Sequence, residues 1–241
     1  MRRPVPSGNV IQGARFAARR GRLLRCATAG VTAVTLLALA AARAATLDVD
    51  VQDARGHGIA GLAVIAERVG ATAAPRAATT AVMDQRRLQF SPELLVVQTG
   101  AAVDFPNSDQ TRHQVYSFSP AKTFQLALYA GRAHPPVVFN RAGIVTLGCN
   151  IHDQMIGYIY VTDSPWFGLT APDGHMVLRD LPAGDYTVRV WHPRLDEVPK
   201  ELSARVSLVA DGAGTASFIV HRPLRPAPGV QAQGAKKWED Y

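Results

Sequence analysis

The chain has 241 residues, of which 47% are hydrophobic and 19% are charged, and its formal net charge is +7. This composition excludes a collagen-like or intrinsically disordered chain, and the length allows one or two domains. A positive net charge suggests nucleic-acid binding, but the charge here lies at one end. Residues 1–44 hold eight arginines and no Asp or Glu, so residues 45–241 have 18 cations against all 19 acids, a net charge of −1. We therefore expect no nucleic-acid partner.

Residues 1–44 have the layout of a secretory signal peptide. An arginine-rich start is followed by an apolar run over residues 26–42 and by Ala42-Arg43-Ala44, a small-x-small cleavage pattern. We predict cleavage after residue 44 and a periplasmic mature protein without stable membrane insertion. An uncleaved anchor is the alternative, but a 17-residue run rich in Ala and Thr is at the lower limit for spanning a bilayer. Arg19-Arg20 leaves twin-arginine export open beside the general secretory route.

Cleavage of this leader would leave Cys149 as the only cysteine of the mature protein. The mature protein could then form no internal disulfide, although export places it in an oxidising compartment. A single thiol in such a compartment is expected to be buried and inert, to be reactive for a purpose, or to bind a metal.

The chain after residue 44 is expected to be all-β, because no segment has a long helical period and Gly, Pro and Asp separate short apolar or alternating runs. We expect a linker at residues 70–81 and a disordered tail at residues 223–241. Eight strands predicted within about 80 residues favour a compact sandwich or Greek-key barrel. The expected strands are 46–51, 62–66, 88–90, 93–98, 102–105, 115–118, 124–128, 137–139, 143–147, 157–161, 174–178, 184–191, 201–208 and 215–220.

The segment Gly148-Cys-Asn-Ile-His-Asp-Gln-Met155 places Cys149, His152 and Met155 at three-residue intervals directly after an expected strand. Copper suits this set of donors, because thiolate and thioether favour Cu(I), imidazole serves both oxidation states, and a weak axial Met tunes the potential. A trigonal site needs a second histidine from elsewhere. His113, in the expected loop between residues 105 and 115, is the best candidate.

Two other interpretations of this segment remain open. Zinc is less suitable, since structural zinc normally takes four Cys or His ligands and Met is not a usual one. Chance spacing beside a buried structural thiol is the other alternative. The remaining histidines have no ligand spacing and are expected to be surface or turn residues: His57, His134, His175, His192 and His221.

Residues 80–163 resemble the cupredoxin (plastocyanin- and amicyanin-like) family. The resemblance is carried, in family order, by the segments 90–100 and 103–109, by His113, and by Cys149-x-x-His152-x-x-Met155 with Gly157-x-Ile-x-Val161. The short ligand loop looks most like amicyanin, and closer still like bacterial plastocyanin-like proteins labelled methylamine utilisation proteins. Two positions differ from the frequent family pattern: Gln114 stands where Asn often braces the ligand loops, and Ile151 stands where Pro is common.

The resemblance implies a cupredoxin Greek-key β-sandwich or barrel that holds one type 1 copper ion through His113, Cys149 and His152, with Met155 axial. The implied function is that of an exported blue copper protein that carries one electron between periplasmic redox partners such as c-type cytochromes or dehydrogenases. His152 would be the ligand nearest solvent and the exit for the electron. Phe118, Tyr158 and Tyr160 could form an apolar surround of the site, or could be ordinary core residues.

Three alternatives to an electron carrier differ in class. A periplasmic copper-binding or delivery protein would exchange the metal, and a sugar- or protein-binding β module would keep only a vestigial site. An enzyme is not expected, because multicopper oxidases and copper nitrite reductases need further histidine clusters and usually a His beside the Cys, whereas Gly148 and Asn150 flank Cys149 here.

Residues 170–190 resemble the middle of carboxypeptidase-regulatory-like (transthyretin-like) β-sandwiches. Such domains begin with a strand, an Asp-x-x-Gly turn and an apolar second strand, and residues 47–66 have that form. We therefore hypothesise that residues 45–72 and 166–222 make one sandwich, with the cupredoxin domain inserted between its second and third strands. In the alternative arrangement, residues 45–72 pack on the cupredoxin domain and residues 166–222 stand apart.

Overall fold

The computed structural model describes residues 44–71, 79–132, 134–196 and 201–227. These residues form strands, turns and irregular segments and contain no helix, which confirms the all-β fold class. None of the described segments, accordingly, has the helical length and apolar character needed to cross a bilayer. The predicted signal peptide lies outside the described residues except for Ala44, with which the first strand begins.

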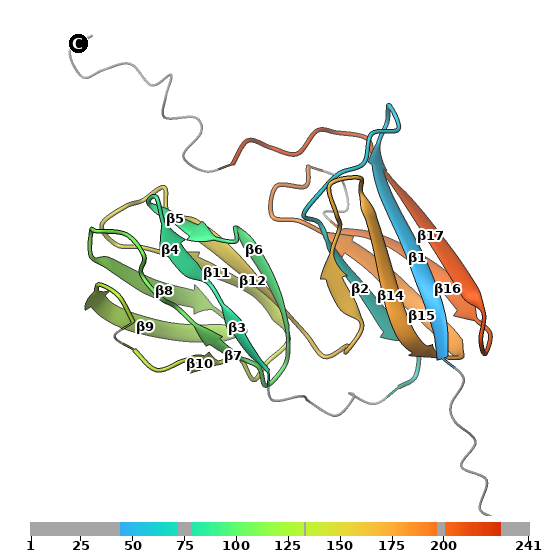
Figure 1. The fold of residues 1–241 in the computed structure, drawn as a ribbon, viewed down its shortest axis with the longest axis horizontal. Helices are drawn as coiled ribbons and strands as arrows, with labels where there is room; N and C mark the ends of the chain where they lie inside the picture. Colours follow the sequence, from blue (N-terminus) through green and yellow to red (C-terminus); the bar gives the residue numbers. More distant parts are fainter. Residues whose placement is uncertain (1–43, 72–78, 133, 197–200, 228–241) are drawn as a thin grey trace, which may run out of the picture. The chain divides into compact units, whose positions relative to one another are not determined.

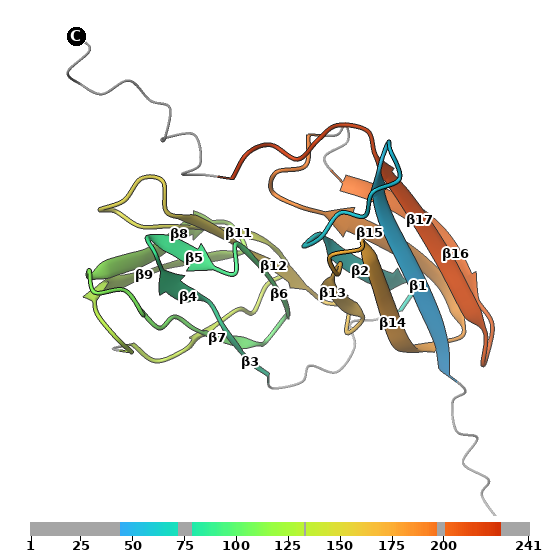
Figure 2. The same ribbon diagram turned by 45° about the horizontal axis from the view of Figure 1, so that its top comes forward.

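Seven strands form a first β-sandwich, here called the flanking sandwich. One of its sheets has the strand order β14-β1-β17 and the other the order β13-β2-β15-β16 (Figures 1 and 2). The strands are β1 (Ala44–Asp53), β2 (Ala63–Arg68), β13 (Phe167–Leu169), β14 (His175–Pro182), β15 (Gly184–Trp191), β16 (Glu201–Leu208) and β17 (Ala213–Val220).

Strand β1 is the middle strand of its sheet and pairs with two strands from the far end of the chain. Val49 lies opposite Met176 in antiparallel β14 and opposite Ala216 in parallel β17. In the other sheet, β2 pairs antiparallel with both β13 and β15. Both sheets therefore combine strands that precede residue 80 with strands that follow residue 163. The domain boundaries themselves stay a prediction.

Alternation along the strands explains which side chains form the core of the flanking sandwich. On β1, Leu47, Val49 and Val51 are fully buried, whereas the intervening Asp48 and Asp50 lie at the partly exposed outer face. This period of two follows from the opposite direction of successive side chains in a strand. The chain leaves β1 through a turn in which the Asp53 carboxylate accepts the N–H groups of Arg55 and His57.

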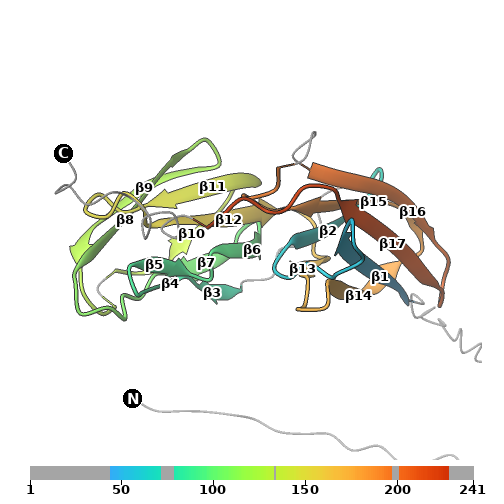
Figure 3. The same ribbon diagram turned by 90° about the horizontal axis from the view of Figure 1, so that it is seen from above.

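Ten strands form a second β-sandwich, here called the central sandwich. A five-stranded sheet has the order β6-β12-β11-β8-β9 and lies over the sheet β10-β7-β3 and the hairpin β4-β5 (Figure 3). The strands are β3 (Thr80–Val82), β4 (Asp84–Arg86), β5 (Gln89–Ser91), β6 (Leu94–Gln98), β7 (Ala102–Asp104), β8 (His113–Ser119), β9 (Lys122–Tyr129), β10 (Val137–Val138), β11 (Gly143–Gly148) and β12 (Ile156–Thr162).

The core of the central sandwich includes two of the predicted metal ligands. Val145 and Leu147 on β11 and Ile159 on β12 are fully buried in the same cluster as Cys149 and Met155. Cys149 and Met155 stand at the ends of two paired strands, so the pairing of β11 with β12 fixes the two ends of the loop between them.

The structure differs from the expected strands at three short elements. Strand β3 lies partly within the predicted linker, and β4 and β13 were not expected. Each pairs with a strand that was expected: β3 with β7, β4 with β5 and β13 with β2. Leu88 was expected in a strand but lies in the turn between β4 and β5 with φ +59°. His113 was expected in a loop and instead begins β8.

Residues 223–227, which were predicted to belong to a disordered tail, lie among the described residues. Leu224 packs against the core of the flanking sandwich, and the Arg225 N–H donates to the carbonyl oxygen of Arg194 at 2.9 Å. One apolar side chain and a backbone hydrogen bond thus hold the start of a segment whose composition is otherwise too polar to pack. Residues 228–241 lie outside the described residues.

Acid is expected to destabilise the folded protein through His192, which follows β15 and is only 5% exposed. Burial, with a smaller contribution from Arg194, lowers the pKa of His192 from 6.5 to about 4. Between pH 6.5 and pH 4, His192 is therefore protonated in the unfolded chain but stays neutral in the folded protein. The free energy of unfolding should therefore keep the whole contribution of His192 above pH 6.5. It should fall by about 3 kcal/mol between pH 6.5 and pH 4.

Urea unfolding at pH 7 and pH 4 would measure this loss. His192→Gln should reduce the difference between the two pH values, because glutamine does not titrate. An unchanged pH dependence in His192→Gln would contradict the assignment.

Candidate metal centre

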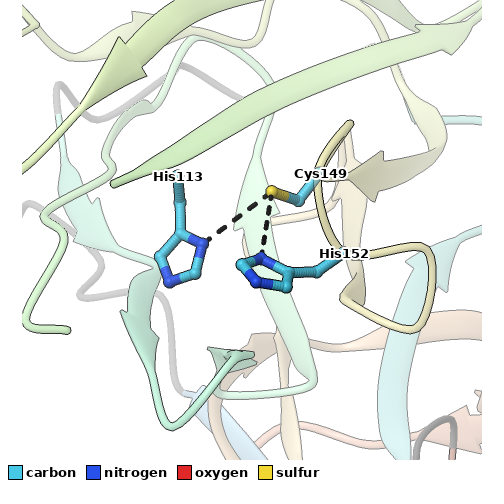
Figure 4. A group of neighbouring side chains, drawn as sticks. All are labelled: His113, Cys149 and His152. Carbon is cyan, nitrogen blue, oxygen red and sulfur yellow. Dashed lines mark hydrogen bonds between the residues drawn. The ribbon is translucent and has the colours of Figure 1, made fainter. Parts of the chain in front are cut away.

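Three of the predicted ligands come together in the central sandwich. One ring nitrogen of His113, one ring nitrogen of His152 and the Sγ atom of Cys149 lie within 4.8 Å of one another. The sulfur is 3.9 Å from each Nδ1, and the two imidazole rings are 4.9 Å apart between centroids (Figure 4). Within the described ranges, no other group of His, Cys, Asp and Glu side chains meets the same spacing.

The loop after β11 converts the three-residue spacing of the sequence into two successive turns. The His152 N–H points to the carbonyl oxygen of Cys149 at 3.4 Å, and the Met155 N–H donates to the carbonyl oxygen of His152 at 2.9 Å. Strand β12 begins directly after Met155. The turns thus return the chain to the sheet and keep all three side chains at one end of the sandwich.

The side chains of the centre differ in their exposure to solvent. His113 is fully buried, Cys149 is 2% exposed and Met155 is 1% exposed. His152 is partly exposed, as expected for the ligand on the loop. Met155 belongs to the same buried cluster as Cys149, so a thioether is present in the apolar surround of the thiol.

Asp109 orients the buried histidine. Its Oδ2 atom lies 2.8 Å from Nε2 of His113. Because an ionised carboxylate only accepts hydrogen bonds, this contact assigns the ring proton to Nε2 and leaves the lone pair of Nδ1 directed toward the Cys149 sulfur. The sequence prediction missed this role. An acid four residues before the proposed ligand, in the same loop, was the available signal.

The same carboxylate also fixes the hairpin turn between β4 and β5. The N–H groups of Arg87 and Leu88 donate to Asp109 at 2.6 and 2.9 Å. Partial burial acts to raise the pKa of Asp109, but the hydrogen bonds from Leu88, His113 and Arg87 together hold that pKa below its ordinary value. Asp109 is therefore an anion with three donors, and it connects the hairpin to the buried histidine.

A buried polar network fixes the loop that carries Asp109. The Asn107 amide donates to the carbonyl oxygens of Thr111 and Tyr129, and its Oδ1 accepts the Asp109 N–H at 3.0 Å. The Tyr129 hydroxyl donates to the carbonyl oxygen of Phe105, and burial raises the pKa of Tyr129 to about 12. Asn107 thus braces the loop that carries Asp109 through its side chain.

The aromatic residues suggested as a surround of the site lie elsewhere. Phe118 is 76% exposed, and the rings of Tyr158 and Tyr160 pack against Trp191. Alternation on β12 explains the difference, since Ile159 points into the core and the two tyrosines point to the other face of the sheet. Tyr116 covers the backbone beside the thiol instead: a Cβ atom at Gly148 would lie 2.7 Å from its Cζ and hydroxyl oxygen.

The other histidines are not brought to the centre. His57 faces Asp53, and His175 faces Asp50 and Asp48 on the flanking sandwich. The His134 ring lies 3.2 Å from the carbonyl oxygen of Ala127. His221 is exposed. His192 begins a turn, as expected, because its carbonyl oxygen accepts the Leu195 N–H at 3.0 Å, but its side chain is buried, which corrects the expectation of a surface residue.

The residues present fit a bound transition metal. Metal–sulfur and metal–nitrogen bonds of about 2.3 and 2.0 Å at about 120° would separate the two ligand atoms by about 3.7 Å, close to the 3.9 Å found for both pairs. One thiolate, two imidazoles and a buried thioether are soft to intermediate donors, which suit copper better than a hard cation or a structural zinc ion.

No protein-family model matches the chain, and no curated protein sequence matches it. Solved structures are similar to part of it. They include the copper-containing nitrite reductase of Thermus scotoductus SA-01 (24% identity, TM-score 0.32), of which this chain covers only 24% while 39% of this chain is matched. A purple cupredoxin from Nitrosopumilus maritimus (19% identity, TM-score 0.31) is covered to 99% by 35% of this chain. The Cu(I) form of an amicyanin variant (20% identity, TM-score 0.32) is covered to 98% by 40% of this chain.

Proposed function

We propose that the chain is an exported, single-copper electron carrier of the cupredoxin type, in which His113, Cys149, His152 and Met155 would hold one type 1 copper ion. The observation that carries this proposal is the convergence of the two histidines on one thiol, with the Cys149 sulfur 3.9 Å from each Nδ1 atom. Bound copper would take up and release one electron. The periplasm and partners such as c-type cytochromes or dehydrogenases belong to the same proposal.

Fast electron transfer requires that the ligands move little when the oxidation state changes, and the chain meets this need with fixed side chains. His113 is held from behind by Asp109, and Asp109 is held by Asn107 and by the turn at residues 87–88. Cys149 follows β11, whose six paired residues fix its backbone. Cys149 and Met155 also belong to one buried apolar cluster, which limits the movement of both side chains.

The partly exposed His152 gives the site one opening to solvent. A partner's redox group could approach the ring edge of His152 while His113 and Cys149 stay buried. Burial of these two ligands favours retention of the metal, and it therefore favours a carrier of electrons over a protein whose purpose is to deliver copper.

Addition of one equivalent of Cu(II) to the purified protein should give intense blue or green absorption and reversible one-electron cycling. Both depend on the thiolate, so Cys149→Ser should abolish the absorption. His175→Gln is the matched control, because it removes a histidine that faces two aspartates outside the centre, and it should leave the absorption unchanged.

Two results would overturn the proposal. A colourless copper complex would exclude a type 1 site, and full copper affinity in Cys149→Ser would exclude the thiol as a ligand. A coloured protein that loses its copper rapidly to an apo-acceptor would favour copper delivery instead.

A further inference from the structure

Asp109 places a carboxylate on the side of the His113 ring that faces away from the cysteine. Figure 4 shows one nitrogen of that ring directed at the Cys149 sulfur and the other directed away from it. The nitrogen that faces away, Nε2, lies 2.8 Å from Oδ2 of Asp109. The ring therefore stands between the thiol and an anion, so the charge of the anion acts on Nδ1, the nitrogen that would bind a metal.

Among the described residues, no Lys or Arg side chain pairs with Asp109, whose one ion-pair contact is the His113 ring. Two other buried acids of the central sandwich each pair with an arginine, at 2.8 and 2.7 Å: Asp84 with Arg86 and Asp104 with Arg132. The remaining donors to Asp109 are the backbone N–H groups of residues 87 and 88, which are dipoles without net charge. The negative charge is therefore left for the histidine and for the metal that the histidine would bind.

The carboxylate is held in place independently of the histidine. Its Oδ1 atom accepts the Arg87 N–H at 2.6 Å, and its Oδ2 atom accepts the Leu88 N–H at 2.9 Å. The Asn107 side chain accepts the Asp109 N–H at 3.0 Å and so fixes the backbone of the same residue. The side chain of Asp109 is only 15% exposed. A fixed charge with little access to water acts more strongly on its surroundings than an exposed charge does.

A neutral acceptor would also keep the ring proton of His113 at Nε2, because a carbonyl or amide oxygen offers the lone pair that this proton needs. A carboxylate adds a negative charge, which makes the imidazole a stronger donor at Nδ1. Cu(II) has one more positive charge than Cu(I), so the oxidised ion gains more from the anion. The charge of Asp109 thus has a consequence that its hydrogen bond alone does not have.

We propose that Asp109 determines which oxidation state of the metal the centre favours. Its unpaired carboxylate stabilises the oxidised, more highly charged ion and so lowers the reduction potential of the centre. The electron comes from a redox partner, and no bond or proton is exchanged at Asp109. This inference rests on the proposed function, because a carrier must match its potential to those of its partners.

The test compares the Cu(I) and Cu(II) affinities of Asp109→Asn with those of the unaltered protein, each by competition with a chelator. Asparagine keeps the size of the side chain and one acceptor oxygen but removes the charge. We expect the Cu(II) affinity to fall about tenfold more than the Cu(I) affinity. For one electron, this change raises the reduction potential by about 59 mV, which a redox titration of the copper-loaded protein would measure directly.

Asp153→Asn is the matched control, because it removes the same charge from an exposed acid of the ligand loop. Water and salt screen an exposed charge, so the ratio of the two affinities should change by less than about threefold in this variant. An equal change in both variants would show an effect of net charge and would overturn the proposal. Parallel losses of both affinities in Asp109→Asn, with an unchanged potential, would also overturn it, because Asp109 would then only position the ring.

The metal-free, unaltered protein gives a readout that needs no variant. The Nε2 proton of His113 should be visible by NMR and slow to exchange with water, because the ring is fully buried and bonded to Asp109. A ring with its proton on Nδ1 would overturn the proposal. A colourless copper complex would contradict the proposed function, whereas the two affinities would still decide the role of Asp109.

Discussion

Replacement of Asp109 by Asn is expected to lower the affinity of the centre for Cu(II) by about 10–100-fold. The carboxylate accepts three hydrogen bonds, from His113 Nε2 and from the N–H groups of Arg87 and Leu88. An amide oxygen can still accept from one or two of these donors, but it has no charge and its NH₂ group would face a donor. The His113 ring would then be held less firmly with Nδ1 toward the sulfur.

Copper affinity would be measured by competition with a chelator, and the ring ¹⁵N signals of His113 would report which nitrogen holds the proton. Asp153→Asn is the control, because Asp153 is an exposed acid of the ligand loop. A loss of affinity in both variants would indicate an effect of net charge. An unchanged ring tautomer and affinity in Asp109→Asn would exclude the positioning role.

Replacement of Leu47 by Ala is expected to lower the free energy of unfolding by about 2–5 kcal/mol. Leu47 is fully buried and stands on β1, the middle strand of its sheet, opposite Leu178 of β14 and Gly214 of β17. The truncation leaves a cavity where a strand from the start of the described chain meets two strands from its end. The copper site should be retained in the folded variant, because Leu47 belongs to the core of the flanking sandwich.

Urea unfolding followed by circular dichroism would give the loss of stability, and copper absorption would follow the central sandwich separately. Ile219→Ala removes a large side chain that is 53% exposed on β17 and should change the stability little. A loss below about 1 kcal/mol in Leu47→Ala would mean that the site closes around the cavity or that β1 is not packed as described.

The strands could be predicted from the sequence wherever a run was long enough to show a pattern. The alternation from Leu47 to Val51 and from Tyr186 to Val190 identifies both strands and their buried faces. Strands β3, β4 and β13 were not expected, and each is fixed by its pairing with an expected strand, namely β7, β5 and β2. The turn at residues 87–88 could not be predicted, since neither Arg nor Leu is typical of positive φ.

The metal ligands, like the strands, could be predicted where the pattern is local, whereas the distances between them depend on the folded protein. The three-residue spacing of Cys149, His152 and Met155 is local, and the structure turns it into a compact loop after β11. His113 was named as the candidate from outside the loop, and its distance from the sulfur depends on the pairing of β8 with β11. The spacing of Asp109 from His113 is also local, but two of the three donors to Asp109, the N–H groups of residues 87 and 88, lie 22 and 21 residues away in the chain and could not be read from it.

The sequence by itself determined the β class of this protein, the confinement of its positive charge to residues 1–44, and the donor spacing around its one described cysteine. These features are properties of residue type and local order. The tertiary structure alone decided the two partners of β1, the burial of His192 and the carboxylate behind His113. Each of these depends on contacts between residues far apart in the chain or across a folded loop. The free energy of such contacts cannot be inferred from a local sequence pattern.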